Sequence, residues 1–257
     1  MKSYVAGLWA AAAMVIGVLA VHADPIAIPN GDFLSPDANS GFYARPDIAV
    51  WQKATTPGWW VYGDGAWDQT TGVFYNIDPT LIDPTLENTF IDNLVSAQAA
   101  FLFAQPEVEL FQVIGAKFEV GNSYQLTFGM LSSTPATPFT GAVKLGTEFD
   151  AVLYYLDDLN NRVAVGTKTV VNSSSIANRT HLTEFVLDIP VVDVNDAWAE
   201  KNIGVQFISR STDETNSGGV WDLGNVQLSF TAGAVPEPAS LAILGVGALA
   251  LLRRRRM

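Results

Sequence analysis

The sequence predicts an all-β protein whose strands form an antiparallel sandwich. Between residues 24 and 230, large apolar side chains recur with a period of about two, which is typical of strands with one face in a core. Breaks rich in Gly, Asn, Asp and Ser, such as residues 172–175 and 213–219, divide these stretches at the spacing of a sandwich. No alternation of strand and helix patterns is visible, which argues against a parallel sheet.

The first 23 residues are predicted to be a secretory signal peptide. Lys2 precedes an apolar stretch from Val5 to Val21, and Val21-His22-Ala23 has the small residues of a cleavage site. The mature chain is therefore expected to begin at Asp24.

Five stretches carry the clearest strand patterns. Alternate positions from Tyr124 to Met130 are all large and apolar, and the same pattern returns at residues 185–189, 203–207 and 226–230. Residues 151–156 are apolar on both faces, which indicates an interior strand, and residues 157–161 then predict a hairpin turn. One helix is expected at Leu86–Ala100, although residues 99–103 also have the composition of a strand.

The central part of the chain is strongly acidic. Residues 24–234 contain 25 of the 26 acidic and 9 of the 14 basic residues, a net charge of −16. This charge repels phosphate backbones and no basic patch is visible, so we expect no nucleic-acid partner. The chain has no cysteine, so burial rather than disulfide bonds must stabilise these residues, which are numerous enough for one domain.

The last 23 residues, 235–257, have three parts. Pro236-Glu237-Pro238 is followed by an apolar run from Leu241 to Leu252, predicted to be helical, and then by a basic cluster of Arg253, Arg254, Arg255 and Arg256. A bilayer core asks for roughly 20 helical residues, but arginine side chains can reach the interface from a shorter segment. The arginines favour the cytoplasm, which leaves the residues before Val235 on the far side of the membrane.

This tail resembles the PEP-CTERM sorting signal of Gram-negative bacteria that make extracellular polysaccharide. The resemblance implies transient insertion into the inner membrane and recognition by an exosortase, a transpeptidase that removes the tail near Pro-Glu-Pro. Pro236, Glu237, Pro238 and the four arginines would then be processing residues. An ordinary tail anchor or a buried amphipathic helix are the alternatives, but neither explains Pro-Glu-Pro at the junction.

A second resemblance spans most of residues 28–230. The segments that carry it are Ile28-Pro-Asn-Gly-Asp-Phe33, Pro57-Gly-Trp-Trp60, Phe118-Glu-Val-Gly-Asn-Ser-Tyr124 and Val220-Trp-Asp-Leu-Gly-Asn-Val-Gln-Leu228. Their order looks like that of galactose-binding-like jelly rolls and the carbohydrate-binding modules of that group. The resemblance implies a two-sheet jelly roll of roughly eight to ten strands for residues 24–234.

The common catalytic constellations are missing from the sequence. The mature chain has one histidine, His181, expected at the surface or as a cap, and no cysteine nucleophile. Glu148-Phe149-Asp150 begins like the Glu-x-Asp-x-x-Glu strand of laminarinase-type hydrolases, but Leu153 stands where that motif needs an acid. We therefore expect a protein that is not an enzyme, with a secreted polysaccharide hydrolase as the alternative.

Calcium is the metal that the abundant acids would suit, since it takes about six to eight oxygen ligands. By the jelly-roll resemblance, Asp32 and Asp222 are the matching positions of a structural calcium site between the first and last strands. The competing interpretation of each is a solvated turn acid.

Aromatic residues are the other candidate binding groups, because sugar rings stack on Trp and Tyr. Trp59, Trp60, Tyr62 and Trp67 lie close together in the sequence. On a strand, Trp59 and Trp60 would point to opposite faces, so at most one belongs to the core. Packing of the second beneath a loop competes with a glycan platform, whereas Trp221 is expected in the core.

These observations predict an exported protein of the cell surface or extracellular matrix. Its expected partners are an exosortase during sorting and extracellular polysaccharide, or biofilm material, afterwards. A self-assembling, calcium-dependent structural surface protein is a further alternative.

Overall fold

The computed structural model describes residues 22–38, 44–55, 70–76, 90–133, 142–178, 180–212 and 219–233. The described residues contain strands, turns and loops but no helix, and hence none that is long and apolar enough to cross a membrane. The all-β prediction is confirmed. Residues 1–21 of the predicted signal peptide, the PEP-CTERM tail with its expected helix, and the aromatic cluster at residues 59–67 lie outside the described residues, whereas Ala23, the last residue before the predicted cleavage point, already belongs to the first strand.

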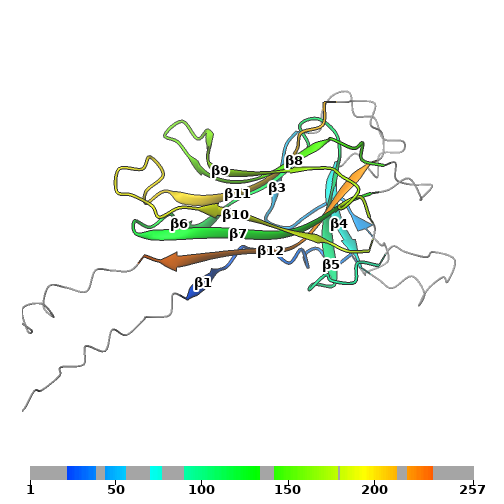
Figure 1. Ribbon diagram of the computed structural model, residues 1–257, viewed down its shortest axis with the longest axis horizontal. Coiled ribbons are helices and arrows are strands. Elements are labelled where there is room, and N and C mark those ends of the chain that lie inside the picture. Colours follow the sequence, from blue (N-terminus) through cyan, green and yellow to red (C-terminus); the bar gives the residue numbers. More distant parts are fainter. Residues whose placement is uncertain are drawn as a thin grey trace, which may run out of the picture.

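The strands form two antiparallel sheets (Figure 1). Sheet A has the order β10 (Thr183–Ile189), β7 (Asn122–Ser132), β12 (Val220–Ala232), β5 (Gln98–Phe103), β4 (Thr71–Tyr75) and β2 (Ala44–Arg45), with β1 (Ala23–Ile26) also paired to β12. Sheet B has the order β3 (Gln52–Lys53), β6 (Glu109–Lys117), β11 (Asn202–Ser209), β8 (Glu148–Leu156) and β9 (Arg162–Val171). The described residues thus form a two-sheet jelly-roll sandwich with 12 strands, two of which contain only two residues.

The longest strand, β12, joins the parts of sheet A. Its first residues, Val220 to Leu223, pair with β5, and its later residues, Leu228 to Thr231, pair with β1. On its other side β12 pairs with β7, with a break in register between Gly224 and Gln227. The short strands β1 and β5 therefore pair with the same edge of β12. The loop after β1 lies near the point along β12 where its pairing with β5 ends and its pairing with β1 begins.

The core lies between the two sheets and follows the predicted alternation. Leu126, Phe128 and Met130 of β7 are fully buried, and they share one cluster with Phe207 of β11. Trp221 of β12 is also fully buried, with its ring centroid 5.4 Å from that of Phe149 in sheet B. Aromatic side chains thus connect the sheets, and the expectation that Trp221 belongs to the core is confirmed.

The predicted helix at Leu86–Ala100 is wrong wherever the structure describes it. Residues 90–97 form turns and irregular chain, and residues 98–100 begin β5. All six residues of β5 are buried, because Ala100 and Leu102 pack in the core between the sheets and Phe101 and Phe103 pack in an apolar cluster on the other face. A strand buried on both faces has no alternation, so periodicity cannot separate it from a buried helix.

Candidate functional site

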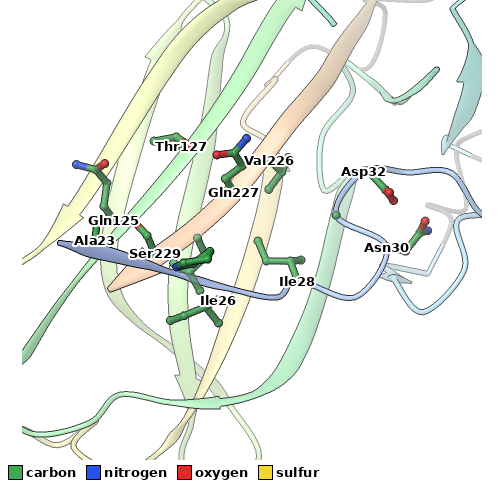
Figure 2. Close-up of a pocket in the computed structure, with 13 residues that line it drawn as sticks. Ala23, Ile26, Ile28, Asn30, Asp32, Gln125, Thr127, Val226, Gln227 and Ser229 are labelled. Atoms are coloured by element: carbon green, nitrogen blue, oxygen red, sulfur yellow. The ribbon is translucent and has the colours of Figure 1, made fainter. Parts of the chain in front are cut away.

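An open groove runs along β1, β12 and β7 on sheet A (Figure 2). Its volume is about 490 Å³. The polar side chains along it are Gln125 and Thr127 from β7, Gln227 and Ser229 from β12, and Asn30 and Asp32 from the loop after β1. Amides and hydroxyls can both donate and accept hydrogen bonds, so the groove suits a ligand rich in hydroxyl groups.

Asn30 shapes the loop that closes one end of this groove. Its side chain accepts a hydrogen bond from the Ser35 backbone nitrogen (2.9 Å) and donates to the carbonyls of Ser35 (2.7 Å) and Ala49 (3.0 Å). Its backbone has a φ of 49°, which asparagine tolerates better than most residues. The Trp51 indole donates to the Asn30 carbonyl (3.0 Å), so the loop is tied to the core.

Two further residues of this loop have different roles: Phe33 is structural and Asp32 is exposed. Phe33 is fully buried, and its carbonyl accepts a hydrogen bond from the Gln98 side chain (2.7 Å). Asp32 is exposed, and its Oδ1 accepts a hydrogen bond from the Leu34 nitrogen at 3.4 Å. The Asn-Gly-Asp-Phe segment therefore anchors the loop through Asn30 and Phe33 and presents Asp32 beside the groove.

Asp222 occupies a different place, on the outer face of sheet A. Its neighbours across the strands are Phe101 of β5 and Leu131 of β7. Phe101 belongs to a small outer cluster with Phe103 and Val220, and Leu131 belongs to another one. Asp222 thus lies half-buried between two apolar clusters.

This apolar setting changes the protonation of Asp222. Burial disfavours the charged carboxylate and raises the pKa of Asp222 to about 7, well above the usual value of 3.8. Near neutral pH a substantial fraction of this carboxyl is therefore protonated and can donate a hydrogen bond as well as accept one. A perturbed carboxyl beside aromatic side chains is a candidate ligand-binding group.

The structure does not form a recognisable calcium centre from the predicted ligands. Among the residues it describes, no group of three or more His, Asp or Glu side chains could hold a metal ion. Asp32 lines the groove, whereas Asp222 lies between the apolar clusters, where a neutral carboxyl is favoured over a charged ligand. The calcium site remains a prediction.

Sheet B carries two charged networks that the sequence did not reveal. Arg162 donates two hydrogen bonds to the buried Glu109 carboxylate (2.7 and 2.9 Å), and its guanidinium lies 3.9 Å from the Phe111 ring centroid. Asp150 accepts hydrogen bonds from Thr169 (2.6 Å) and Arg210 (2.7 Å). Their partners are 19 to 60 residues apart in the chain, so only the folded sheet brings them together.

His181 lies at the surface, as expected. Its Nδ1 is 2.8 Å from Asp92 Oδ1, and both side chains are more than half exposed. Asn93 is 3.4 Å from the other ring nitrogen. This arrangement ties the loop before β5 to the loop before β10 and includes no serine or cysteine nucleophile.

The fold and the tail define an exported β-sandwich with a sorting signal. Residues 234–256 match the PEP-CTERM protein-sorting motif, which confirms the resemblance and indicates export and exosortase-processed placement at the cell surface. No curated protein matches the chain.

Several solved structures are similar to this chain to different degrees. The Stig cyclase Fisc from Fischerella sp. TAU, in complex with (3Z)-3-(1-methyl-2-pyrrolidinylidene)-3H-indole, is 15% identical, with a TM-score of 0.61 over 82% of this chain and 100% of that chain. The CBM22-2 xylan-binding domain of Paenibacillus barcinonensis Xyn10C is 11% identical, with a TM-score of 0.39 over 73% of this chain and 94% of that one. A CBM4 structure is 11% identical, with a TM-score of 0.35 over 79% and 99%. At these identities the cyclase shows the fold alone, and the two weaker likenesses carry no argument about a ligand.

Proposed function

We propose that this chain is a non-enzymatic surface protein whose sandwich binds extracellular polysaccharide after sorting by an exosortase. The sorting motif supports the location, and the groove of Figure 2 supports the ligand class. Its four amide and hydroxyl side chains on β7 and β12 are neutral, and the partly buried Ile26 and Ile28 supply aliphatic surface beside them. Hydroxyl groups and the apolar C–H faces of a sugar fit this combination.

The groove gives a direct test of glycan binding. A protein of residues 24–233 is expected to migrate more slowly in native gels that contain a polysaccharide to which it binds. The Gln125→Ala/Gln227→Ala variant should lower the affinity measured in this way roughly tenfold, since each lost hydrogen bond contributes about 0.5–1.5 kcal/mol. Gln52→Ala, on β3 of sheet B, is the matched control. Bacterial and plant polysaccharides would be compared with and without calcium.

A second variant separates the groove from the aromatic cluster. If Trp59→Ala/Trp60→Ala abolishes retardation while the groove variant does not, the aromatic pair rather than the groove binds the glycan. The absence of retardation on every polymer, with or without calcium, would contradict the proposal.

Hydrolysis of the same polymer is the competing activity. The Asp150 carboxylate is engaged by Arg210 and Thr169, and Leu153 is buried in the core. These contacts favour a structural role for Asp150. Release of reducing sugar by the wild-type protein, lost in Asp150→Asn, would reverse this assignment.

Calcium binding is proposed separately and has its own measurement. If Asp32 is a ligand, excess calcium should raise the melting temperature by several degrees, because a ligand at 100 times its Kd stabilises a fold by about 2.7 kcal/mol. The Asp32→Asn variant should lose that increase. Light scattering on the same samples would detect calcium-dependent assembly, and an unchanged melting temperature would rule out this site.

A further inference from the structure

Both ends of the described sandwich leave it at the same end (Figure 1). Ala23, the first residue of β1, pairs with Thr231 near the end of β12. The Gly233 nitrogen then donates to the Gly121 carbonyl at 2.7 Å. A side chain at Gly233 would lie 2.3 Å from that carbonyl oxygen, so the chain is held tightly against the β6–β7 turn immediately before the sorting motif.

Three turns lie at this end of the sandwich, and we call them the terminal rim: residues 118–122, 157–161 and 190–201. The Gly121 nitrogen donates to the Val192 carbonyl at 2.9 Å, and the Glu200 nitrogen donates to the Phe118 carbonyl at 2.8 Å. Lys201 forms an ion pair with Asp158 at 3.3 Å. These contacts join the three turns into one continuous surface.

Each of the three turns exposes an aliphatic side chain. Val120, Leu159, Val191 and Val194 are 43, 81, 56 and 72% exposed. Single exposed aliphatic residues are common, but here they gather at the end from which the sorting tail departs. Aliphatic tips suit the interface of a bilayer.

The rim also carries six acids, Glu119, Asp157, Asp158, Asp193, Asp196 and Glu200, against the single base Lys201. Hydrogen bonds from Asn161 lower the pKa of Asp157, and those from Asn195 lower the pKa of Asp193, which keeps both charged. Anionic lipid headgroups repel such a surface. Contact with a bilayer therefore depends on a tether.

The tail provides a short tether. Seven residues lie between Gly233 and Leu241, and the eight steps from one Cα to the next reach at most about 28 Å. The 13 residues of β12 alone extend about 40 Å away from that point. The rim can therefore rest on the membrane surface, whereas the opposite end, with Leu145, stands farther away.

We propose that the terminal rim faces the lipid bilayer while the tail is inserted. The inference rests on the proposed tail insertion. It assigns the turns of the rim to the membrane side and leaves the opposite end of the sandwich exposed to the extracytoplasmic space.

The absence of native cysteines makes the orientation measurable. Val194→Cys and Leu159→Cys place a fluorophore on the rim, and Leu145→Cys, also exposed, places one at the opposite end. The chain without its signal peptide but with its tail would be reconstituted into phosphatidylcholine vesicles containing phosphatidylglycerol and a headgroup-attached quencher. Quenching is expected to be at least threefold stronger at both rim positions than at Leu145, and equal or reversed quenching overturns the orientation.

Two further measurements, flotation and cleavage, distinguish failure of the orientation from failure of the tail insertion on which it rests. A chain that does not float with the vesicles overturns tail insertion and the inference with it, whereas flotation with equal quenching overturns only the orientation. Proteolytic cleavage at a site inserted between Gly233 and Ala234 should move the sandwich from the vesicles into solution. A sandwich that stays bound after cleavage overturns the dependence of this contact on the tether.

Discussion

Replacing Trp221 with alanine is expected to lower the free energy of unfolding by about 4 kcal/mol. The side chain is fully buried and spans the space between the sheets, where it packs on Phe149. Its Nε1 donates to Ser209 Oγ of β11 at 3.4 Å. Its removal would leave a cavity at the contact between β12 and sheet B. Urea denaturation of residues 24–233, followed by circular dichroism, measures the effect.

Two control variants accompany this measurement. Trp221→Phe keeps most of the apolar volume and should lose less than half as much stability. Leu159→Ala removes an aliphatic side chain that is 81% exposed and should stay within about 0.5 kcal/mol of the wild type. If Trp221→Ala behaves like Leu159→Ala, the tryptophan does not join the two sheets.

Much of the sandwich could be predicted because half-buried strands leave a period of two in the sequence. The pattern from Tyr124 to Met130 falls within β7, and residues 203–207 and 226–230 fall within β11 and β12. The turn at residues 157–161 is also confirmed: Asp157 Oδ1 accepts hydrogen bonds from the nitrogens of Leu159 and Asn161 at 2.9 and 2.8 Å. Local patterns are enough where one face is wet and the turn residues bond to each other.

The sequence-based predictions of secondary structure fail where tertiary contacts decide the conformation. Residues 99–103 are apolar throughout and both faces of this strand are buried, so the sequence carries no period there. The two-residue strands β2 and β3 are too short to leave any pattern. Their pairing with β4 and β6 depends on the fold rather than on local propensity.

The candidate sites show the same division. Asp32 and Asp222 could be singled out from neighbouring motifs, but the sequence does not show that Asp32 is exposed. The apolar surroundings of Asp222 arise only when β12 pairs with β5 and β7. The groove combines β1 with β12, which are separated by some two hundred residues of sequence. Sequence motifs therefore indicated positions, and the folded sheet determined which of them share a surface.

Asp222 is expected to destabilise the fold above neutral pH, so Asp222→Asn should stabilise it there by on the order of 2 kcal/mol. The folded pKa of about 7 exceeds the unfolded value of 3.8. Between these values the native state keeps a proton that the unfolded state has lost, so the contribution of this carboxyl to stability decreases as the pH rises from about 4 to 7. Because Asp222 is partly exposed, the full shift is discounted for solvent screening.

Urea titrations of wild type and Asp222→Asn at pH 4 and pH 8 test this sign. The two proteins should have similar stability at pH 4, where the carboxyl is protonated in the native state and still partly protonated in the unfolded state, and the variant should be more stable at pH 8. Glu184→Gln, at an exposed position of β10, controls for the loss of one negative charge. An equal difference at both pH values would mean that the outer apolar clusters do not desolvate Asp222. A difference that appears only at pH 8 would instead show that the desolvated carboxylate of Asp222 lowers the stability of the fold.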